Sequence, residues 1–392
     1  MNIYKRKELK RCKYKVSLSK QEELLASLSK RTDTEARRLE RYIALPDLTR
    51  KKGNPVEKII SVIINLPIFK NFDIIDTPEV IPSELVFDLF NFPKNHPART
   101  SSDTYFIDEK HILRPHTSLM WKYYLDIPEV IDRLKKHGMV GVLSYGTVYR
   151  RDEIDWQHSN VLHQIDGLFI CDKNVKHVTE QDLIHILTEV ADVLYGTEVE
   201  RRFNVDRFSY TDPSIEMEIK WDDDWVEILG AGIPHPQVIE NLGLDSSRYT
   251  GWAFGFGADR LAMIKMRIPD IRLLRSEDTR VTKQFNSLEH IYQPVSKYPA
   301  IVHDISFVVD FDRFNIFEYY ELTREIISGD FVEEMEQIDM YENVERFGKG
   351  KVSYTFRITY RHLDKTLTRD EVIRLHKKLE KETCERLSAE IR

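Results

Sequence analysis

The sequence predicts an α+β protein in which a mostly antiparallel sheet, flanked by helices, is followed by a smaller unit of different topology. Two observations support this fold class. Strand-like runs follow one another in the middle of the chain with few helices between them, which favours antiparallel pairing over a doubly wound sheet. From about Tyr292 onward the order of expected elements changes. The strand-like runs of the middle part are Val140–Arg151, Val161–Cys171, Ile215–Trp221, Trp225–Leu229 and Gly251–Gly257.

The composition is that of a folded soluble protein. Of the 392 residues, 41% are apolar and 31% are charged, which excludes a disordered or fibrous chain. No apolar run approaches the roughly 18 residues of a membrane span. The three cysteines lie far apart, which argues against a disulfide framework and a cysteine-rich zinc site and fits a reducing compartment. We therefore expect a cytoplasmic protein, with the matrix of a mitochondrion or another organelle as the alternative.

The N-terminal part is basic. Residues 1–52 hold 16 Lys and Arg against 7 Asp and Glu, and they predict a basic arm followed by a charged helix near Lys20–Tyr42. A break at 51–55 precedes a helix expected in Val56–Leu66. Further along, Thr179 with Asp182 forms a capping-box pattern, which predicts that a helix begins there.

The C-terminal hundred residues predict a ferredoxin-like unit. A strand with Ile305 and Phe307 on one face precedes a helix near Ile316–Ile327, two strands and a last helix, which is a β-α-β-β-α order without an obvious final strand. The two strands are Phe331–Tyr341 and Tyr354–Tyr360, and Thr368 with Glu371 caps the last helix. Residues 346–378 carry ten bases and three acids. Such a segment suits contact with a polyanion, and solvated helix faces are the alternative.

The densest polar region is a predicted hairpin, residues 146–167. Its first strand ends near Arg150, and its return strand carries Gln164 and Asp166 two residues apart, so both side chains point to one face. A carboxylate beside an amide oxygen suits a ligand ammonium group, and the planar guanidinium of Arg150 suits a phosphate. The alternative is a surface hairpin with solvated charges.

A second motif is the glycine-containing segment 251–263. Gly255 and Gly257 leave room for a ligand against the backbone, and Arg260 begins a helix directly afterwards. A Gly-x-Gly pattern alone is a weak signal. Because no βαβ unit surrounds it, this segment lacks the context of a dinucleotide-binding motif.

Together, these segments resemble the phenylalanyl-tRNA synthetases, most closely the single-chain type of organelles. The resemblance covers roughly residues 90–392 and implies a class II catalytic domain at 53–290 and a ferredoxin-like anticodon-binding domain at 291–392, after the basic arm and helix of 1–52. It consists of matching segments in the family's order. These are His96–Arg99 with Asp103–Tyr105, Leu113–Ser118, the hairpin, Phe208–Ser214, Glu227–Gly230 through Arg260 to Ile268–Arg272, and Ser296–Ala300 with Arg357–His362.

The resemblance implies an ATP-dependent ligase. The carboxylate of phenylalanine attacks the α-phosphorus of ATP, and the resulting adenylate passes its acyl group to the terminal ribose of tRNA, here tRNA-Phe. ATP and Mg²⁺ are therefore the expected cofactors, and phenylalanine and tRNA the expected partners. The fused C-terminal domain implies a monomer with no obligatory second subunit. No membrane partner is expected.

The resemblance also assigns roles to residues. Arg150, Arg260 and His158 are expected to contact the phosphates and to be the catalytic residues. The other residues expected around ATP are Asp152, Leu162, Glu227 and Gly257. Those expected around the amino acid are His116, Ser118, Gln164, Asp166, Phe208, Tyr210, Ala253 and Phe106. Possible protein-side contacts of Mg²⁺ are Glu216 and Glu227, and the expected tRNA contacts are Arg357, Arg361, Arg369, Arg374 and Lys377.

Several residues depart from the family's usual pattern. Asp166 stands where glutamate is typical, as do Asp212 and Asp259, and Leu162 replaces a phenylalanine that usually stacks on adenine. Tyr210 places a phenol at the amino-acid wall. These departures keep two other hypotheses open: a synthetase for another aromatic or β-amino acid, and a catalytically silent tRNA-binding paralogue. The structural alternative for Phe208, Tyr210 and Ala253 is ordinary core packing.

Overall fold

The computed structural model describes residues 10–295, 298–327 and 331–392, and it divides into two compact units. The first consists of the described part of Met1–Arg150 with Val161–Ile268 and Phe285–Ile291. The second consists of Arg151–Asn160, Pro269–Gln284 and the described part of Tyr292–Arg392. The first nine residues of the predicted basic arm, and Ser296 and Lys297 of the last matching segment, lie outside the described residues.

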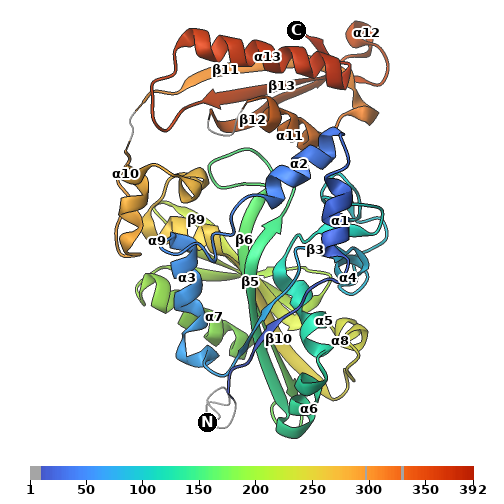
Figure 1. The fold of residues 1–392 in the computed structure, drawn as a ribbon, viewed down its shortest axis with the longest axis vertical. Coiled ribbons are helices and arrows are strands. Elements are labelled where there is room, and N and C mark those ends of the chain that lie inside the picture. Colours follow the sequence, from blue (N-terminus) through green and yellow to red (C-terminus); the bar gives the residue numbers. More distant parts are fainter. Residues whose placement is uncertain (1–9, 296–297, 328–330) are drawn as a thin grey trace. The chain divides into compact units, whose positions relative to one another are not determined.

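The first unit is built on an eight-stranded sheet in the order β1-β2-β5-β6-β10-β9-β8-β7. Figure 1 labels its strands β5, β6, β9 and β10. All neighbouring strands are antiparallel except the parallel pairs β1–β2 and β2–β5, which confirms the predicted mostly antiparallel sheet. Each predicted central strand is present. The strands are β1 (Lys13–Lys15), β2 (Asp73–Asp76), β5 (Met139–Tyr149), β6 (Val161–Asp172), β7 (Arg201–Asp206), β8 (Thr211–Trp221), β9 (Asp224–Pro234) and β10 (Tyr249–Gly257). A separate small sheet pairs β3 (Val80–Pro82) with β4 (His111–Leu113).

The helices of the first unit follow their local capping signals. The capping box of Thr179 and Asp182 is formed as predicted and begins α7. The single helix predicted near Lys20–Tyr42 is wrong, because the segment forms two helices. Asp33 accepts a hydrogen bond from the amide of Ala36 and so begins a new helix. The helices are α1 (Gln21–Leu28), α2 (Thr34–Ile43), α3 (Pro55–Ile64), α4 (Glu84–Phe87), α5 (Met120–Leu125), α6 (Pro128–His137), α7 (Glu180–Tyr195), α8 (Pro236–Asn241) and α9 (Ala258–Met266).

The core of the first unit lies on both sides of the central strands. On one side, Val142 and Leu168 of the sheet pack with Trp121 of α5 and Leu134 of α6. Elsewhere in the unit, an aromatic stack is formed by Phe72, Phe169, Trp252 and Phe254. Because β6 runs through this apolar surrounding, any polar side chain that it buries needs a hydrogen-bond partner.

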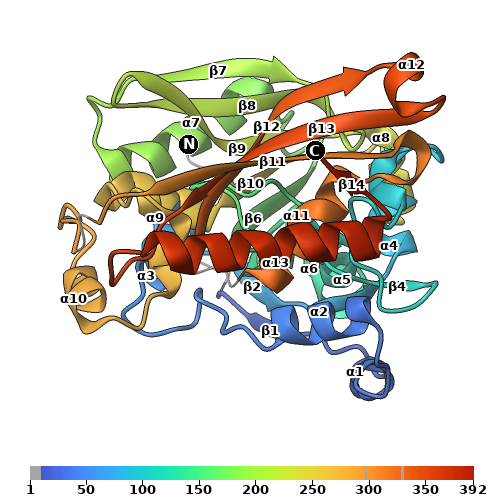
Figure 2. The ribbon, with the colours of Figure 1, turned by 90° about the horizontal axis from the view of Figure 1, so that it is seen from above.

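The second unit has a four-stranded sheet in the order β12-β13-β11-β14, with α13 along the sheet (Figure 2). The ferredoxin-like order is confirmed, and Thr368 and Glu371 form the predicted capping box. A final strand is nevertheless present, contrary to prediction: β14 is only two residues long and pairs with Phe307 and Val308 of β11. The elements are α10 (Thr279–Thr282), β11 (Ile301–Asp310), α11 (Ile316–Ile326), β12 (Val332–Glu342), α12 (Val344–Phe347), β13 (Lys351–Tyr360), α13 (Arg369–Leu387) and β14 (Glu390–Ile391).

The loop between β5 and β6 belongs to the second unit. Ile154 pairs through its backbone with Met335 of β12, and its side chain is buried in the apolar core of that unit. Arg151 forms an ion pair with Glu318, at 2.7 Å between Nη1 and Oε1. In the described ranges, no helix is both long enough and apolar enough to cross a bilayer.

Candidate active site

The residues that follow β4 are anchored to the end of β5. Arg114 is 1% exposed, and its guanidinium donates to the carbonyl oxygens of Thr147 and Thr77, both at 2.7 Å. Directly after β5, Arg150 donates from Nε to the carbonyl oxygen of Pro115 at 2.7 Å. Arg150 is thus oriented by the backbone next to His116. Sequence reasoning assigned no role to Arg114, because its partners come from distant segments.

Four of the residues predicted for the amino acid form a buried polar group. Ser118 donates from Oγ to Oδ2 of Asp166 at 2.6 Å. The other oxygen of Asp166, Oε1 of Gln164 and both ring nitrogens of His116 are buried and have no hydrogen-bond partner within the described part of the chain. Because buried polar atoms are nearly always paired, this group points to a polar ligand.

Burial also shifts the titration of this group. Desolvation raises the pKa of Asp166 to about 6, although the hydrogen bond from Ser118 and the charge of Arg150 oppose the rise. Desolvation lowers the pKa of His116 to about 3, and the charge of Arg150 lowers it further. His116 is therefore neutral at pH 7. The positive charge of Arg150 thus acts on both His116 and Asp166.

An aromatic wall adjoins this polar group. The rings of Phe208 and Tyr210 stack at 5.4 Å with an angle of 9° between their planes. Phe90 meets the rings of Tyr210 and His116 edge to face, each at 5.5 Å, and so joins the aromatic wall to the polar group. Ala253 is 4% exposed and lies in the same core cluster as Phe90. Phe90 was missed by sequence reasoning, since one phenylalanine in an apolar segment carries no local signal.

Phe106 packs elsewhere. It contacts the separate apolar cluster that contains Phe87, Ile112 and Leu119, and its backbone pairs with Ile112. The family resemblance led us to expect Phe106 on the near side of the amino-acid pocket. Its predicted contact with the amino acid stays a prediction.

Two glycines make room for these side chains. Gly255 of β10 pairs with Asp166 of β6, and a Cβ at Gly255 would lie 2.6 Å from Oδ1 of that carboxylate. Gly230 of β9 pairs with Gly255 from the other side, and a Cβ there would lie 2.8 Å from the ring of Phe208. Both distances are shorter than real Cβ contacts. The glycines are thus a requirement of the site's geometry, whereas the predicted room for a ligand at Gly255 stays a prediction.

The second predicted arginine lies at the start of α9. Arg260 donates from Nη1 to the carbonyl oxygen of Glu227 at 2.8 Å. Desolvation raises the pKa of the Glu227 carboxyl, Glu216 adds to the rise, and the charges of Arg260 and Arg150 oppose it. Both arginines therefore act on the same carboxyl group.

Glu216 and Glu227 can be tested as a cation site. Oε1 of Glu216 accepts a hydrogen bond from Nδ2 of Asn204 at 2.9 Å, and its charge contributes to the raised pKa of Glu227. The two carboxylates offer the oxygen ligands that Mg²⁺ prefers. The donor set therefore fits the ion.

Leu162 and Gly257, which are predicted to contact ATP, lie on the neighbouring strands β6 and β10.

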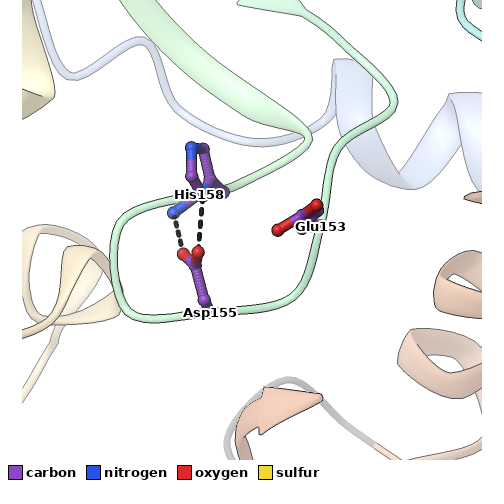
Figure 3. Close-up of side chains that lie close together, drawn as sticks. All are labelled: Glu153, Asp155 and His158. Carbon is purple, nitrogen blue, oxygen red and sulfur yellow. Dashed lines mark hydrogen bonds and ion pairs between the residues drawn. The ribbon is translucent and has the colours of Figure 1, made fainter. Parts of the chain in front are cut away.

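His158 and Asp152 lie in the loop of the second unit. Asp155 accepts a hydrogen bond from the amide of Gln157 at 2.7 Å. It also accepts one from the amide of His158 and is hydrogen-bonded to Nδ1 of that residue, each at 2.7 Å (Figure 3). With Glu153, these side chains place ligand atoms within 4.8 Å of one another. Because three nitrogens already contact Asp155, we assign no metal to this group. Asp152 accepts a hydrogen bond from the amide of Glu153 at 2.9 Å.

The predicted tRNA contacts differ in their surroundings. Arg357 of β13 forms two 2.9 Å bonds to Asp304, and Glu336 is its neighbour on β12. Arg361 is paired with Glu333 at 2.5 Å. The other three predicted contacts, all exposed on α13, are Arg369, Arg374 and Lys377.

The aromatic residues of β13 and Arg357 do not share a face of this sheet. Tyr354, Phe356 and Tyr360 are buried in the core of the second unit, whereas Arg357 is exposed. Side chains alternate between the two faces of a strand, so residues one apart cannot share a face. The exposed face around Arg357 instead carries the carboxylates of Asp304 and Glu336.

Family models match nearly the whole chain. Residues 41–285 match the tRNA synthetases class II core domain (F), and residues 296–392 match the ferredoxin-fold anticodon binding domain. The first match covers more than half of the chain. The polar group, the aromatic wall and both arginines lie within it.

Curated relatives agree with these matches. A mouse protein named phenylalanine–tRNA ligase, mitochondrial, is 34% identical over 361 residues, which covers 83% of this chain and 76% of the relative. An Arabidopsis thaliana phenylalanine–tRNA ligase, chloroplastic/mitochondrial, is 35% identical and covers 83% and 73%. The alpha subunit of the Staphylococcus carnosus phenylalanine–tRNA ligase is 37% identical over 63% of this chain and 71% of the subunit. The chain belongs to the class II aminoacyl-tRNA synthetases, within the phenylalanine–tRNA ligases that carry the catalytic core and the anticodon-binding domain on one polypeptide.

Proposed function

We propose that this chain activates phenylalanine with ATP and transfers it to tRNA-Phe, and that the residues described above carry the reaction. The observation that supports these roles most directly is the set of unpaired buried atoms on His116, Gln164 and Asp166 beside the rings of Phe208 and Tyr210. An α-amino acid with an aromatic side chain matches both features. Its ammonium and carboxylate groups would supply the missing partners, and its ring would contact the aromatic wall.

The first step is an in-line displacement. A carboxylate oxygen of phenylalanine forms a bond to the α-phosphorus of ATP, and the bond from that phosphorus to the bridging oxygen breaks, releasing pyrophosphate. Negative charge spreads over the phosphate oxygens in the transition state. Arg150 and Arg260 would stabilise that charge, and the bond from Arg150 to Pro115 fixes its guanidinium before the substrates bind. The contacts of His158 and Asp152 with ATP, expected from the resemblance, stay predictions, because both residues belong to the second unit. In the second step a ribose hydroxyl of tRNA attacks the acyl carbon and AMP leaves.

The amino-acid residues would have separate tasks. Asp166, oriented by Ser118, would accept hydrogen bonds from the ammonium group, and Gln164 would accept a further one. Neutral His116 could bond the substrate without adding charge. Ala253 would end the site and leave depth for an unsubstituted ring. Phe106 would contribute from the near side.

Mg²⁺ and ATP are used generally by class II synthetases, and we propose both for this chain. When bound, Mg²⁺ would offset the negative charge of the phosphate oxygens. Glu216 and Glu227 would provide its protein-side contacts, because their carboxylates offer oxygen ligands and the negative charge of Glu216 acts on Glu227. Leu162 would contact the adenine with less surface than a phenylalanine ring. Gly257 would admit the nucleotide close to the backbone.

The test is pyrophosphate exchange into ATP with a panel of amino acids. We expect exchange with phenylalanine and much weaker exchange with tyrosine and with β-phenylalanine. Tyr210 carries a phenolic hydroxyl in the aromatic wall, so a preference for another aromatic or β-amino acid would favour the second substrate hypothesis. Absence of exchange with every amino acid, combined with retained tRNA binding, would identify a silent paralogue.

We also propose that the protein acts as a monomer in an organelle. The mouse and Arabidopsis relatives are named as mitochondrial and as chloroplastic/mitochondrial, so the cytoplasmic expectation finds less support than its alternative. The proposed domains remain 1–52, 53–290 and 291–392. Light scattering on the purified chain tests the oligomeric state, and imaging of a C-terminally tagged full chain tests the compartment.

A further inference from the structure

A buried histidine and a buried aspartate connect the strand that carries Gln164 to the helix that carries Arg260. His163 is 0% exposed on β6, and Asp259 is 4% exposed in the first turn of α9. The amide of His163 donates to Oδ2 of Asp259 at 2.5 Å, and Nδ1 of the same residue lies 2.8 Å from Oδ1. One carboxylate therefore binds both the backbone and the side chain of one residue.

The other ring nitrogen of His163 contacts a third segment. The amide of Leu48 donates to Nε2 at 3.1 Å. Because an amide can only donate, Nε2 must accept, and the proton of the neutral ring lies on Nδ1 and is donated to Asp259. The imidazole thus connects the segment at Leu48, strand β6 and helix α9.

The neighbours of this pair are the residues proposed to hold the two substrates. His163 directly precedes Gln164, and Asp259 directly precedes Arg260. The backbone register also pairs Gln164 with Gly257, the N-cap residue of α9. That helix begins without a side-chain cap, so Asp259 is free to bond across to β6 rather than to its own first turn.

We propose that His163 and Asp259 are positioning residues, which set the separation between the amino-acid side of the site at Gln164 and the nucleotide side at Arg260. The inference rests on the proposed function, because the roles of Gln164 and Arg260 belong to it. The remainder of α9 is held by apolar packing through Leu261, Met263 and Met266, so the helix does not depend on this pair to form. Loss of the pair shifts the first turn of α9 against β6.

Two substitutions of His163 separate its two bonds. In His163→Asn, the amide nitrogen takes the place of Nδ1 and keeps the bond to Asp259, but the acceptor for Leu48 is lost. In His163→Gln, the amide oxygen can reach the place of Nε2 and accept from Leu48, but the donor to Asp259 is lost. We expect His163→Gln to raise the KM of both ATP and phenylalanine about tenfold and His163→Asn to change them less than about threefold.

Asp259→Asn changes the acceptor of the pair instead of the donor. Its amide NH₂ group faces a donor of His163, so one of the two hydrogen bonds is lost. It should reproduce the KM changes of His163→Gln, and the double variant should be no worse than either single variant. Tyr124→Phe is a matched control in the same unit, since it removes a buried 2.6 Å hydrogen bond to Asp73. It should lower the melting temperature and leave both KM values unchanged.

The readouts are KM and kcat for each substrate in pyrophosphate exchange, together with melting temperature. If His163→Gln lowers the melting temperature as Tyr124→Phe does but leaves both KM values unchanged, the pair is merely structural and the inference is wrong. Should His163→Gln fail to fold, Asp259→Asn decides in the same way. Absence of exchange in the unsubstituted protein would instead reject the proposed function, and the inference with it.

Discussion

The carboxylate of Asp166 lies above the backbone of Gly255 on the neighbouring strand, where a Cβ would come within 2.6 Å of Oδ1. This oxygen is one of the buried atoms that have no partner in the described structure. The glycine therefore sets how far the carboxylate can extend into the site. A shorter aspartate in place of the family's glutamate makes that position more critical, because Asp166 has one methylene less with which to reach a ligand.

Substitution of Gly255 should therefore impair amino-acid binding. Gly255→Ala is expected to displace Asp166 and raise the KM of phenylalanine by at least about tenfold, with a smaller effect on the KM of ATP. Gly257→Ala is the matched comparison, since its Cβ would meet Arg260 at an ordinary 3.8 Å. That variant should change the KM of ATP rather than that of phenylalanine. Equal KM values for phenylalanine in Gly255→Ala and in the unsubstituted protein would contradict the role of Asp166.

The raised pKa of Asp166 predicts how phenylalanine binding depends on pH. Burial raises the pKa to about 6 from the ordinary 3.8, so the free protein holds the proton more tightly than the unfolded chain. Through this group, the folded state is stabilised at low pH relative to the unfolded chain. This contribution to the free energy of unfolding is lost as the pH rises from 3.8 through 6. A substrate ammonium group needs the carboxylate, so binding below pH 6 must release a proton.

We therefore expect the Kd of phenylalanine to rise by up to about tenfold for each pH unit below 6. Isothermal titration calorimetry in buffers of different ionisation enthalpy measures both the affinity and the protons released. Asp166→Asn should bind more weakly at pH 7 and lose this pH dependence. An affinity that stays constant from pH 7 to pH 5 in the unsubstituted protein would show that Asp166 does not receive the ammonium group.

Arg150 should act mainly on the rate of adenylate formation. Arg150→Ala is expected to cost about 3 kcal/mol of transition-state stabilisation, which corresponds to a loss of about two orders of magnitude in the exchange rate. Arg150→Lys keeps the charge but cannot bond to Pro115 and to a phosphate at the same time. Its exchange rate should therefore lie between those of the unsubstituted protein and Arg150→Ala. Melting temperatures should stay close to that of the unsubstituted protein. Near-normal exchange in Arg150→Ala would remove this residue from the catalytic set.

Local signals explain which parts of the fold could be predicted from the sequence. The capping boxes at Thr179 and Thr368 depend on residues three apart, so both helix starts were predicted correctly. The strand β14 was missed because two residues leave no periodic pattern, and it exists only through pairing with β11. The break between α1 and α2 was missed because a cap at Asp33 interrupts a continuous charged pattern.

The candidate site shows the same limit. Gln164 and Asp166 could be predicted to share a face because strand alternation is local. Arg114 and Phe90 could not, since their roles depend on Thr77 and Tyr210, which the fold brings from other segments. On β13 the alternation is likewise local, and the structure shows Arg357 exposed while Tyr354, Phe356 and Tyr360 are buried.

The pairing of Arg357 with Asp304 leads to the last prediction, which concerns tRNA. An RNA phosphate near Arg357 must compete with a carboxylate that already makes two 2.9 Å bonds to it. The exposed Arg374 and Lys377 on α13 have greater freedom to contact phosphates. Arg374→Ala combined with Lys377→Ala should therefore raise the KM of tRNA severalfold and reduce the salt dependence of binding by about one unit of slope for each charge removed.

Arg357→Ala should have the smaller effect, because Asp304 already offsets the charge that it removes. Aminoacylation at several salt concentrations measures both variants, and pyrophosphate exchange without tRNA checks that the catalytic unit is intact. Asp304→Asn supplies the opposite test: it releases Arg357, and it should tighten tRNA binding if the arginine lies in the interface. If Arg357→Ala weakens tRNA binding more than the α13 double variant, RNA displaces the carboxylate, and the exposed face of β13 rather than α13 is the principal contact.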